Sequence, residues 1–240
     1  MAYTTIDNPT LYFEATTYTG GATDVSSLSF QPDWVWAKKR SGSENHGLFD
    51  SVRGATQSMN SNTTAAESAR SGSLTSFDSD GWTMGGSDGI ISASGSTYVG
   101  WAWKAGTAFS NDASATGVGT IDSTGSINTT SGFSILTFTT PSADGNFTVA
   151  HGLGSIPQWV IVKTRGNVDN WQIFHHKLGN ANIVKLNTTD ASASTGIFGS
   201  TNPTSSVFTL NKDSFGGGLT AVAYCFAEKK GYSKFGSYTS

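Results

Sequence analysis

The sequence predicts an all-β protein made of two tandem jelly-roll or β-sandwich units joined by a linker rich in Gly, Ser and Thr. Composition is the first reason. The chain has 29 Gly, 5 Pro, 12% aromatic and 13% charged residues, a balance typical of many short strands and turns rather than of a disordered chain. A repeated segment is the second reason, "PDWVWAKKR" at residues 32–40 and "PQWVIVKTR" at residues 157–165.

The repeat continues into a second pair of predicted strands, "TYVGWAWKAG" (residues 97–106) and "TAVAYCFAEKKG" (residues 220–231). Aligning them places Trp101 on Tyr224 and Trp103 on Phe226, and their alternation indicates strands with one buried face. We therefore expect unit one at residues 1–106, a linker at residues 107–132 and unit two at residues 133–240.

The segment "SLTSFDSDGWTMGG" (residues 73–86) predicts a hairpin, because an Asp-Gly pair separates two runs with strand character. Asp78 and Asp80 also resemble the first half of a calcium loop, which makes them weak metal candidates. The remaining ligands of such a loop are absent, so a simple turn is the preferred interpretation. We expect neither a metal nor a cofactor.

Nine residues form what we call the aromatic signature, the positions shared by the two repeats. They are Pro32, Trp34, Trp36, Trp101, Trp103, Pro157, Trp159, Tyr224 and Phe226. Two interpretations are open, a packed sandwich core or a lectin-like surface on which sugar rings stack. The second repeat has Ile161 where the first has Trp36, and Ile fills volume without offering a flat ring. This substitution favours the core interpretation.

The last ten residues, "GYSKFGSYTS", resemble the opening strand of unit one, "YFEATTYTGG" at residues 12–21. They therefore read as the first strand of a third repeat. A strand without a following unit has an unpaired edge that must be covered. We expect Tyr232, Phe235 and Tyr238 to close unit two or to contact a partner subunit.

Several classes of function are disfavoured. The net charge of −3 and pI of about 5.7 do not fit a nucleic-acid-binding protein. The first residues lack the features of a secretory signal peptide, and no apolar run is long enough to span a membrane. Cys225 is the only cysteine, so the chain forms no internal disulfide.

No catalytic motif stands out. His175 and His176 are predicted to point to opposite faces of a strand, and neither an HExxH nor a GxSxG motif is present. His46, Asp50 and Ser51 are close in sequence without forming a known motif. No motif nominates two carboxylates as a glycosidase pair. The candidates for such a pair are Glu44, Asp50, Glu67, Asp78, Asp80 and Asp88. We predict that the protein is not an enzyme.

The motifs also carry a family resemblance. "PDWVWAKKRSGSENHGLFDSVRGATQSM", "LTSFDSDGWTMG" and "TYVGWAWKAG" resemble a repeated domain of bacteriophage virion proteins that is frequent in marine phages. The second unit, with "VAHGLGSIPQWVIVKTRG", "WQIFHH", "PTSSVFTL" and "AYCFAEKKGYSKFGSYT", resembles another variant of that domain. Such domains are described as tail-fibre-like, or as laminin-G or concanavalin-like sandwiches. The resemblance brings no catalytic residues.

The resemblance implies a structural protein of the virion, made in the host cytoplasm without a signal peptide. We expect a tail fibre or appendage component that attaches to a host surface glycan or protein without catalysis. A head decoration or a tail or capsid connector is the alternative, and a capsule depolymerase is a distant one. The expected partners are other virion proteins and further copies of the chain, with a trimer favoured, and neither nucleic acid nor membrane insertion is expected.

Overall fold

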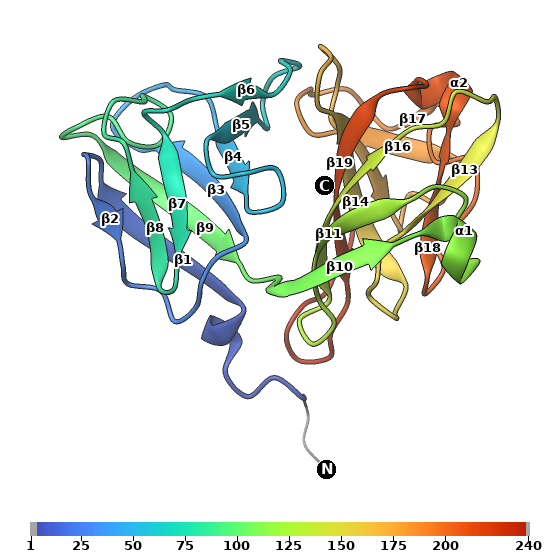
Figure 1. Ribbon diagram of the computed structural model, residues 1–240, viewed down its shortest axis with the longest axis horizontal. Coiled ribbons are helices and arrows are strands. Elements are labelled where there is room, and N and C mark those ends of the chain that lie inside the picture. Colours follow the sequence, from blue (N-terminus) through green and yellow to red (C-terminus); the bar gives the residue numbers. More distant parts are fainter. Residues whose placement is uncertain (1–3, 239–240) are drawn as a thin grey trace. The chain divides into compact units, whose positions relative to one another are not determined.

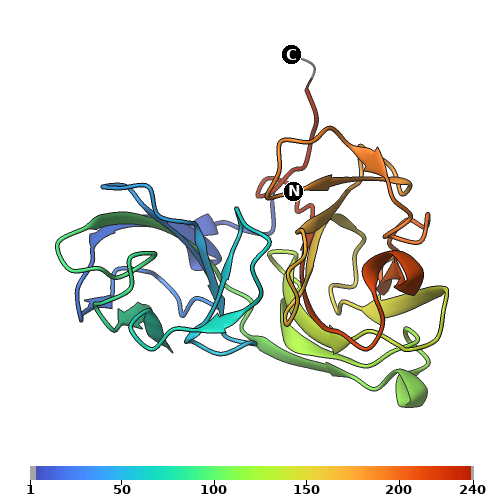
Figure 2. The same cartoon turned by 90° about the horizontal axis from the view of Figure 1, so that it is seen from above.

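The computed structural model describes residues 4–238 and confirms an all-β protein with several antiparallel sheets. The chain divides into two compact units, which we call the N-terminal unit (Asn8–Gly106) and the C-terminal unit (Thr107–Ser240 with Met1–Asp7). Each unit consists of a large sheet and a small sheet (Figure 1, Figure 2). The two units are described separately below.

The N-terminal unit has a six-stranded sheet with the order β1-β9-β3-β4-β5-β6 and a three-stranded sheet with the order β2-β8-β7. A 3-10 turn η1 (Pro9–Leu11) is followed by β1 (Phe13–Thr19), β2 (Asp24–Val25), β3 (Trp34–Lys39), β4 (Gly47–Asp50), β5 (Gln57–Asn60), β6 (Ser68–Ala69), β7 (Leu74–Asp78), β8 (Gly81–Met84) and β9 (Thr97–Trp103). The predicted hairpin at residues 73–86 is confirmed as β7–β8.

The core of the N-terminal unit lies between its two sheets. Val35, Ala37 and Ala102 of the large sheet pack in one cluster with Trp82 and Met84 of the small sheet. The large sheet contributes mainly small side chains here, and the small sheet contributes the fully buried indole of Trp82. Alternation along a strand then places Trp34 and Trp36 on the opposite face of the large sheet.

The C-terminal unit has an eight-stranded sheet with the order β10-β11-β12-β19-β14-β15-β16-β17 and a two-stranded sheet, β13-β18. Its elements are β10 (Thr107–Asn111), α1 (Ala113–Thr116), β11 (Ser123–Asn128), β12 (Phe133–Thr139), β13 (Asn146–Ala150), β14 (Pro157–Thr164), β15 (Gln172–His175), β16 (Asn182–Lys185), β17 (Ala193–Ser194), β18 (Val207–Asn211), α2 (Lys212–Phe215) and β19 (Thr220–Ala227). Its core joins Val160, Val162 and Ala223 of the large sheet to Phe147 and Phe208 of the small one.

The two large sheets share a strand order and a register. The order β1-β9-β3-β4-β5-β6 of the N-terminal unit corresponds to β12-β19-β14-β15-β16-β17 of the C-terminal unit. Trp34 pairs with Trp103 across β3 and β9, and Trp159 pairs with Phe226 across β14 and β19. The repeated sequence segments therefore occupy matching positions in the two sheets.

The expected linker at residues 107–132 is instead part of the C-terminal unit. Strand β10 pairs with β11, and β11 pairs with β12 along its length. The polar composition misled the sequence interpretation, because strands near a sheet edge need little apolar surface. Gly125 shows the close contact, since a Cβ atom there would lie 1.9 Å from the backbone oxygen of Ile135.

The expected third-repeat strand at the C-terminus does not form in residues 231–238, and residues 239–240 lie outside the described residues. A turn places the Phe235 ring against Trp159 and Phe226, with ring centroids 6.0 and 6.1 Å apart. Tyr232 is half-buried, whereas Tyr238 is 94% exposed. Phe235 therefore closes part of the C-terminal unit.

Candidate functional site

The aromatic rings of the signature lie on the face of each large sheet that is turned away from its small sheet, where Trp34, Tyr224 and Phe226 are buried as the core interpretation expected. Trp34 is 1% exposed, but Trp36, Trp101 and Trp103 are only half-buried. Sequence periodicity shows that these residues share a face, but it does not say which face meets the second sheet. The smaller residues of the alternate set take the inner face, because the indole of Trp82 needs that space.

The half-buried part of this row surrounds an apolar cavity of about 270 Å³, lined by Trp36, His46, Trp101 and Trp103. We call it the aromatic cavity. Trp36 stands nearly perpendicular to Trp101, with an angle of 75° and 6.3 Å between ring centroids. It makes a similar edge contact with His46, at 67° and 6.3 Å. The rings therefore present walls in different directions rather than one flat stack.

His46 takes part in the cavity as a neutral ring. The Trp36 Nε1–H donates a hydrogen bond of 3.3 Å to His46 Nδ1, which requires that nitrogen to be unprotonated. Burial lowers the pKa of His46, and the positive charge of Lys38 lowers it further. The Lys38 ammonium donates to the backbone oxygens of Lys39 and Glu44 at 3.1 and 2.9 Å.

The corresponding face of the C-terminal unit has a different aromatic cluster. Trp159 stacks on Phe226 with ring centroids 5.1 Å apart, and Phe133 contacts Phe226 at 4.8 Å. Phe235 then packs on this cluster, as described above. Tyr224 is fully buried beside Trp171, with ring centroids 6.3 Å apart.

The two signature prolines have a structural role at the start of their repeats. Both are buried, Pro32 just before β3 and Pro157 as the first residue of β14. The register of β14 against β19 shifts between Pro157 and Trp159. A proline has no backbone N–H to donate, so a strand start or an irregularity is where it fits.

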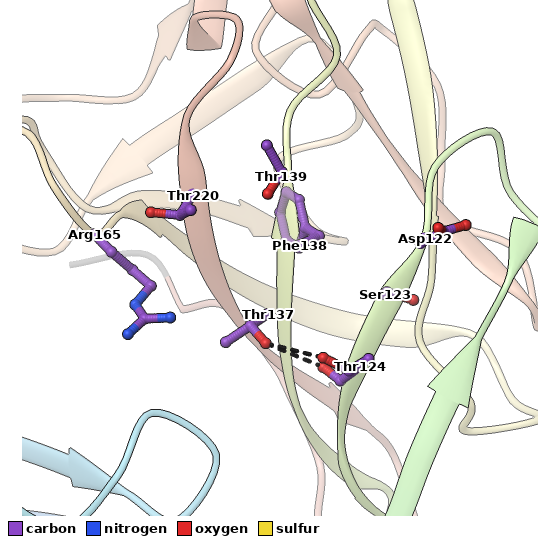
Figure 3. A pocket seen from close by; sticks show the side chains of 8 residues that line it. All are labelled: Asp122, Ser123, Thr124, Thr137, Phe138, Thr139, Arg165 and Thr220. Atoms are coloured by element: carbon purple, nitrogen blue, oxygen red, sulfur yellow. Dashed lines mark hydrogen bonds between the residues drawn. The ribbon is translucent and has the colours of Figure 1, made fainter.

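A second, polar cavity of about 440 Å³ lies in the C-terminal unit, and we call it the threonine pocket (Figure 3). It is lined by Asp122, Ser123, Thr124, Thr137, Phe138, Thr139, Arg165 and Thr220. The threonines come from β11, β12 and β19, and Arg165 directly follows β14. Sequence reasoning missed this pocket. The Thr137 and Thr139 pair, two residues apart on one strand, was the available signal.

The weak metal candidates occupy a hairpin turn. Asp78 accepts hydrogen bonds from the hydroxyls of Ser76 and Thr83, at 2.8 and 2.7 Å, and Asp80 is exposed. Gly81 is required at this turn because a Cβ atom there would lie 1.5 Å from the Val25 backbone oxygen. Within residues 4–238, no group of three or more His, Cys, Asp or Glu side chains is arranged to hold a metal ion.

Three of the carboxylates considered for catalysis, Asp50, Glu67 and Asp88, make ion pairs within the N-terminal unit. Asp50 makes a buried ion pair with Arg53, whose guanidinium also contacts Glu67 at 3.0 Å. Asp88 pairs with Arg70 at 3.4 Å and accepts a hydrogen bond from the backbone of Ile90. Neither the aromatic cavity nor the threonine pocket is lined by two carboxylates.

Residues 8–240 match a protein family described as a domain of unknown function (DUF7483). The chain belongs to this family. The match covers both units, so the family extends over the whole two-unit arrangement rather than over one repeat. No curated protein and no solved structure matches the chain. Among the described residues, no helix has the length and apolar character needed to cross a membrane.

Proposed function

We propose that the protein is a non-enzymatic structural protein of a bacteriophage virion, in a tail fibre or appendage that contacts the host surface. The motif resemblance supports the virion assignment. A contact role suits a fold of stiff antiparallel sheets with ligand-sized cavities on the outer sheet faces. The two units are proposed to be tandem copies of one jelly-roll sandwich, supported by their common strand order and register.

The aromatic cavity carries the proposal of host contact. Three indoles and one neutral imidazole line a space open to a small ligand, on the sheet face that the sandwich core does not use. Aromatic rings provide large apolar contact at low conformational cost, and sugar rings have apolar C–H faces that match them. A host-surface saccharide is the ligand class that we propose for this cavity.

The alternative of a decoration or connector protein predicts a large apolar patch for binding other virion proteins. In the part of the chain that the structure describes, the large hydrophobic side chains that are exposed are Leu11, Ile156, Val168 and Tyr238. These positions are scattered along the sequence. A tail fibre would present aromatic residues for contact, and Tyr238 is the exposed aromatic side chain among the described residues. The aromatic surface proposed for binding lies on a sheet instead.

A capsule depolymerase would need a cleft lined by at least two carboxylates. The two cavities contain one carboxylate between them, Asp122, which supports the non-enzymatic proposal. We propose that weak single-site binding is strengthened by homo-oligomerisation, with a trimer favoured, since linked sites raise avidity by roughly 10²–10⁴. Light scattering on the purified chain measures this directly, and a monomer at micromolar concentration would contradict it.

A glycan array tests host contact. The wild-type protein should bind a defined set of host-surface glycans, and Trp101→Ala should lose that binding because it removes one wall of the cavity. Tyr238→Ala is the matched control, since Tyr238 is an exposed aromatic residue outside the cavity. Equal binding by Trp101→Ala and the wild type would refute the cavity. Antibody labelling of virions in electron micrographs tests the location separately.

A further inference from the structure

We propose that the threonine pocket of the C-terminal unit binds a short acidic saccharide, with sugar hydroxyls on the threonines and a sugar carboxylate on Arg165. This site is separate from the aromatic cavity, so the inference goes beyond the proposed function. It rests on the arrangement of hydroxyls across three neighbouring strands, on the position of the one cationic residue in the lining and on the size of the pocket.

The threonines form two cross-strand pairs. Thr124 on β11 lies opposite Thr137 on β12, and their hydroxyls are 3.2 Å apart. Thr139 on β12 lies opposite Thr220 on β19. Directly paired residues on adjacent strands point to the same face, and so do residues two positions apart on one strand, so the four side chains gather on one side of the sheet (Figure 3).

The Thr139 and Thr220 hydroxyls are available to a ligand. Both residues are exposed, and neither hydroxyl makes a hydrogen bond to another residue within positions 4–238. By contrast, the Ser123 hydroxyl donates to the Ala150 backbone oxygen at 2.9 Å. A threonine hydroxyl both donates and accepts, and this matches the hydroxyls of a sugar better than it matches a purely anionic ligand.

The two charged residues lie at different ends of the pocket. Figure 3 shows Arg165 beyond Thr220 on one side and Asp122 on the other, with the threonines between them. The Arg165 backbone N–H donates to the Thr220 oxygen at 2.8 Å, which fixes the base of this side chain. Asp122 accepts a hydrogen bond from the Ala113 backbone at 2.9 Å. A ligand carboxylate therefore belongs at the Arg165 end.

Arginine suits this task for a geometric reason. The guanidinium has five N–H donors in a plane and binds a carboxylate through two parallel hydrogen bonds. Because the guanidinium has five donors, Arg165 can donate hydrogen bonds to a ligand while it keeps its contacts with other protein groups. Lysine at the same position would keep the charge but lose the paired hydrogen bonds.

The size of the pocket agrees with a saccharide of more than one ring. Its volume of about 440 Å³ lies in the range of small-molecule sites, roughly 300–1,000 Å³. The lining runs over β11, β12, β19 and the end of β14, which are neighbours in the sheet. Three strand spacings of about 4.8 Å make a distance of roughly 14 Å.

Calorimetric titration of the full chain with trigalacturonic acid and with its neutral methyl ester tests the proposal. The acid should bind, and the ester should bind at least about tenfold more weakly, because a charge-assisted bidentate contact is lost. Thr139→Val and Thr220→Val should each weaken binding of the acid by about two- to tenfold, since each removes one hydroxyl at constant volume. Arg165→Lys should retain part of the affinity, and Arg165→Gln should lose more.

Thr148→Val is the matched control, because it makes the same change in the same unit outside the pocket lining. Circular dichroism establishes that every variant is folded, and the two exposed threonine positions keep the test valid if Arg165→Gln does not fold. Absence of binding by the acid overturns the proposal. Equal binding of acid and ester, or unchanged affinity in both Val variants, also overturns it. Trp101→Ala should leave this binding unchanged, so the two proposed sites fail or succeed separately.

Discussion

We predict that Gly100 cannot be replaced without loss of stability while the Trp82 ring packs against it. A Cβ atom at position 100 would lie 2.8 Å from Trp82 Cη2 and 3.1 Å from Cζ2, too close for a carbon contact. Trp82 is fully buried in the core between the sheets, so its ring has no free space into which to move. Gly100→Ala should therefore lower the free energy of unfolding by about 1–3 kcal/mol, as overpacked cores do.

The clash is with one edge of the indole, so a smaller ring should relieve it. Phenylalanine lacks the Cη2 and Cζ2 atoms, and Trp82→Phe also removes a buried Nε1 that has no hydrogen-bond partner among the described residues. Trp82→Phe alone should cost about 1–3 kcal/mol of stability through lost packing. The double variant should lose about 1–2 kcal/mol less stability than the sum of the two single losses, which is within the usual range of coupling energies for contacting residues.

Urea unfolding followed by far-ultraviolet circular dichroism measures all four states of this cycle. Gly166→Ala is the control, since nothing lies within 4 Å of a Cβ at that position. Gly166→Ala should change the free energy of unfolding only slightly, and this change should be additive with that of Trp82→Phe. Strictly additive losses for Gly100→Ala and Trp82→Phe would refute the close approach of these two residues and, with it, the assignment of the inner sheet face.

Three further predictions concern single groups. His151 is buried, accepts a hydrogen bond from the Leu153 backbone at Nδ1 and contacts the Thr204 oxygen through Nε2. Burial lowers the pKa of His151 in the folded protein. The contribution of His151 to stability should therefore be fully present above a pH of about 6.5, and the free energy of unfolding should fall by at most ~1.4 kcal/mol per pH unit as the pH decreases from there through the folded pKa. Urea midpoints between pH 5 and 8 should show this slope, and an unchanged slope in His151→Gln would contradict it. Burial raises the pKa of the Cys225 thiol to about 12, so a thiol reagent should react with it only in denaturant, and rapid labelling of the native protein would be the contrary result. Treatment with a chelator should leave the thermal midpoint unchanged, because Asp78 is satisfied by two hydroxyls; a fall of several degrees would indicate a bound metal.

The predicted acid sensitivity and the predicted protection of the thiol both depend on burial that the sequence does not display. "HGLG" at residues 151–154 reads as a turn, and the structure shows the imidazole enclosed beside it. Cys225 belongs to an alternating strand whose inner face could be either of two sets. In both cases the chemical group is visible in the sequence, and its environment depends on residues far along the chain.

Patterns in the sequence were enough to predict the β class, the β7–β8 hairpin and the correspondence between the two repeated segments. Alternation is a property of a strand itself, and an Asp-Gly turn acts within a few residues, so both can be read from neighbouring positions. The tertiary structure alone decided that Val35 and Ala37 face the core while Trp36 faces outward. It also decided that residues 107–132 join a sheet and that Thr139, Thr220 and Arg165 meet in one pocket. These features depend on which sheet face is covered and on which distant strands become neighbours, and a period of two residues contains neither kind of information.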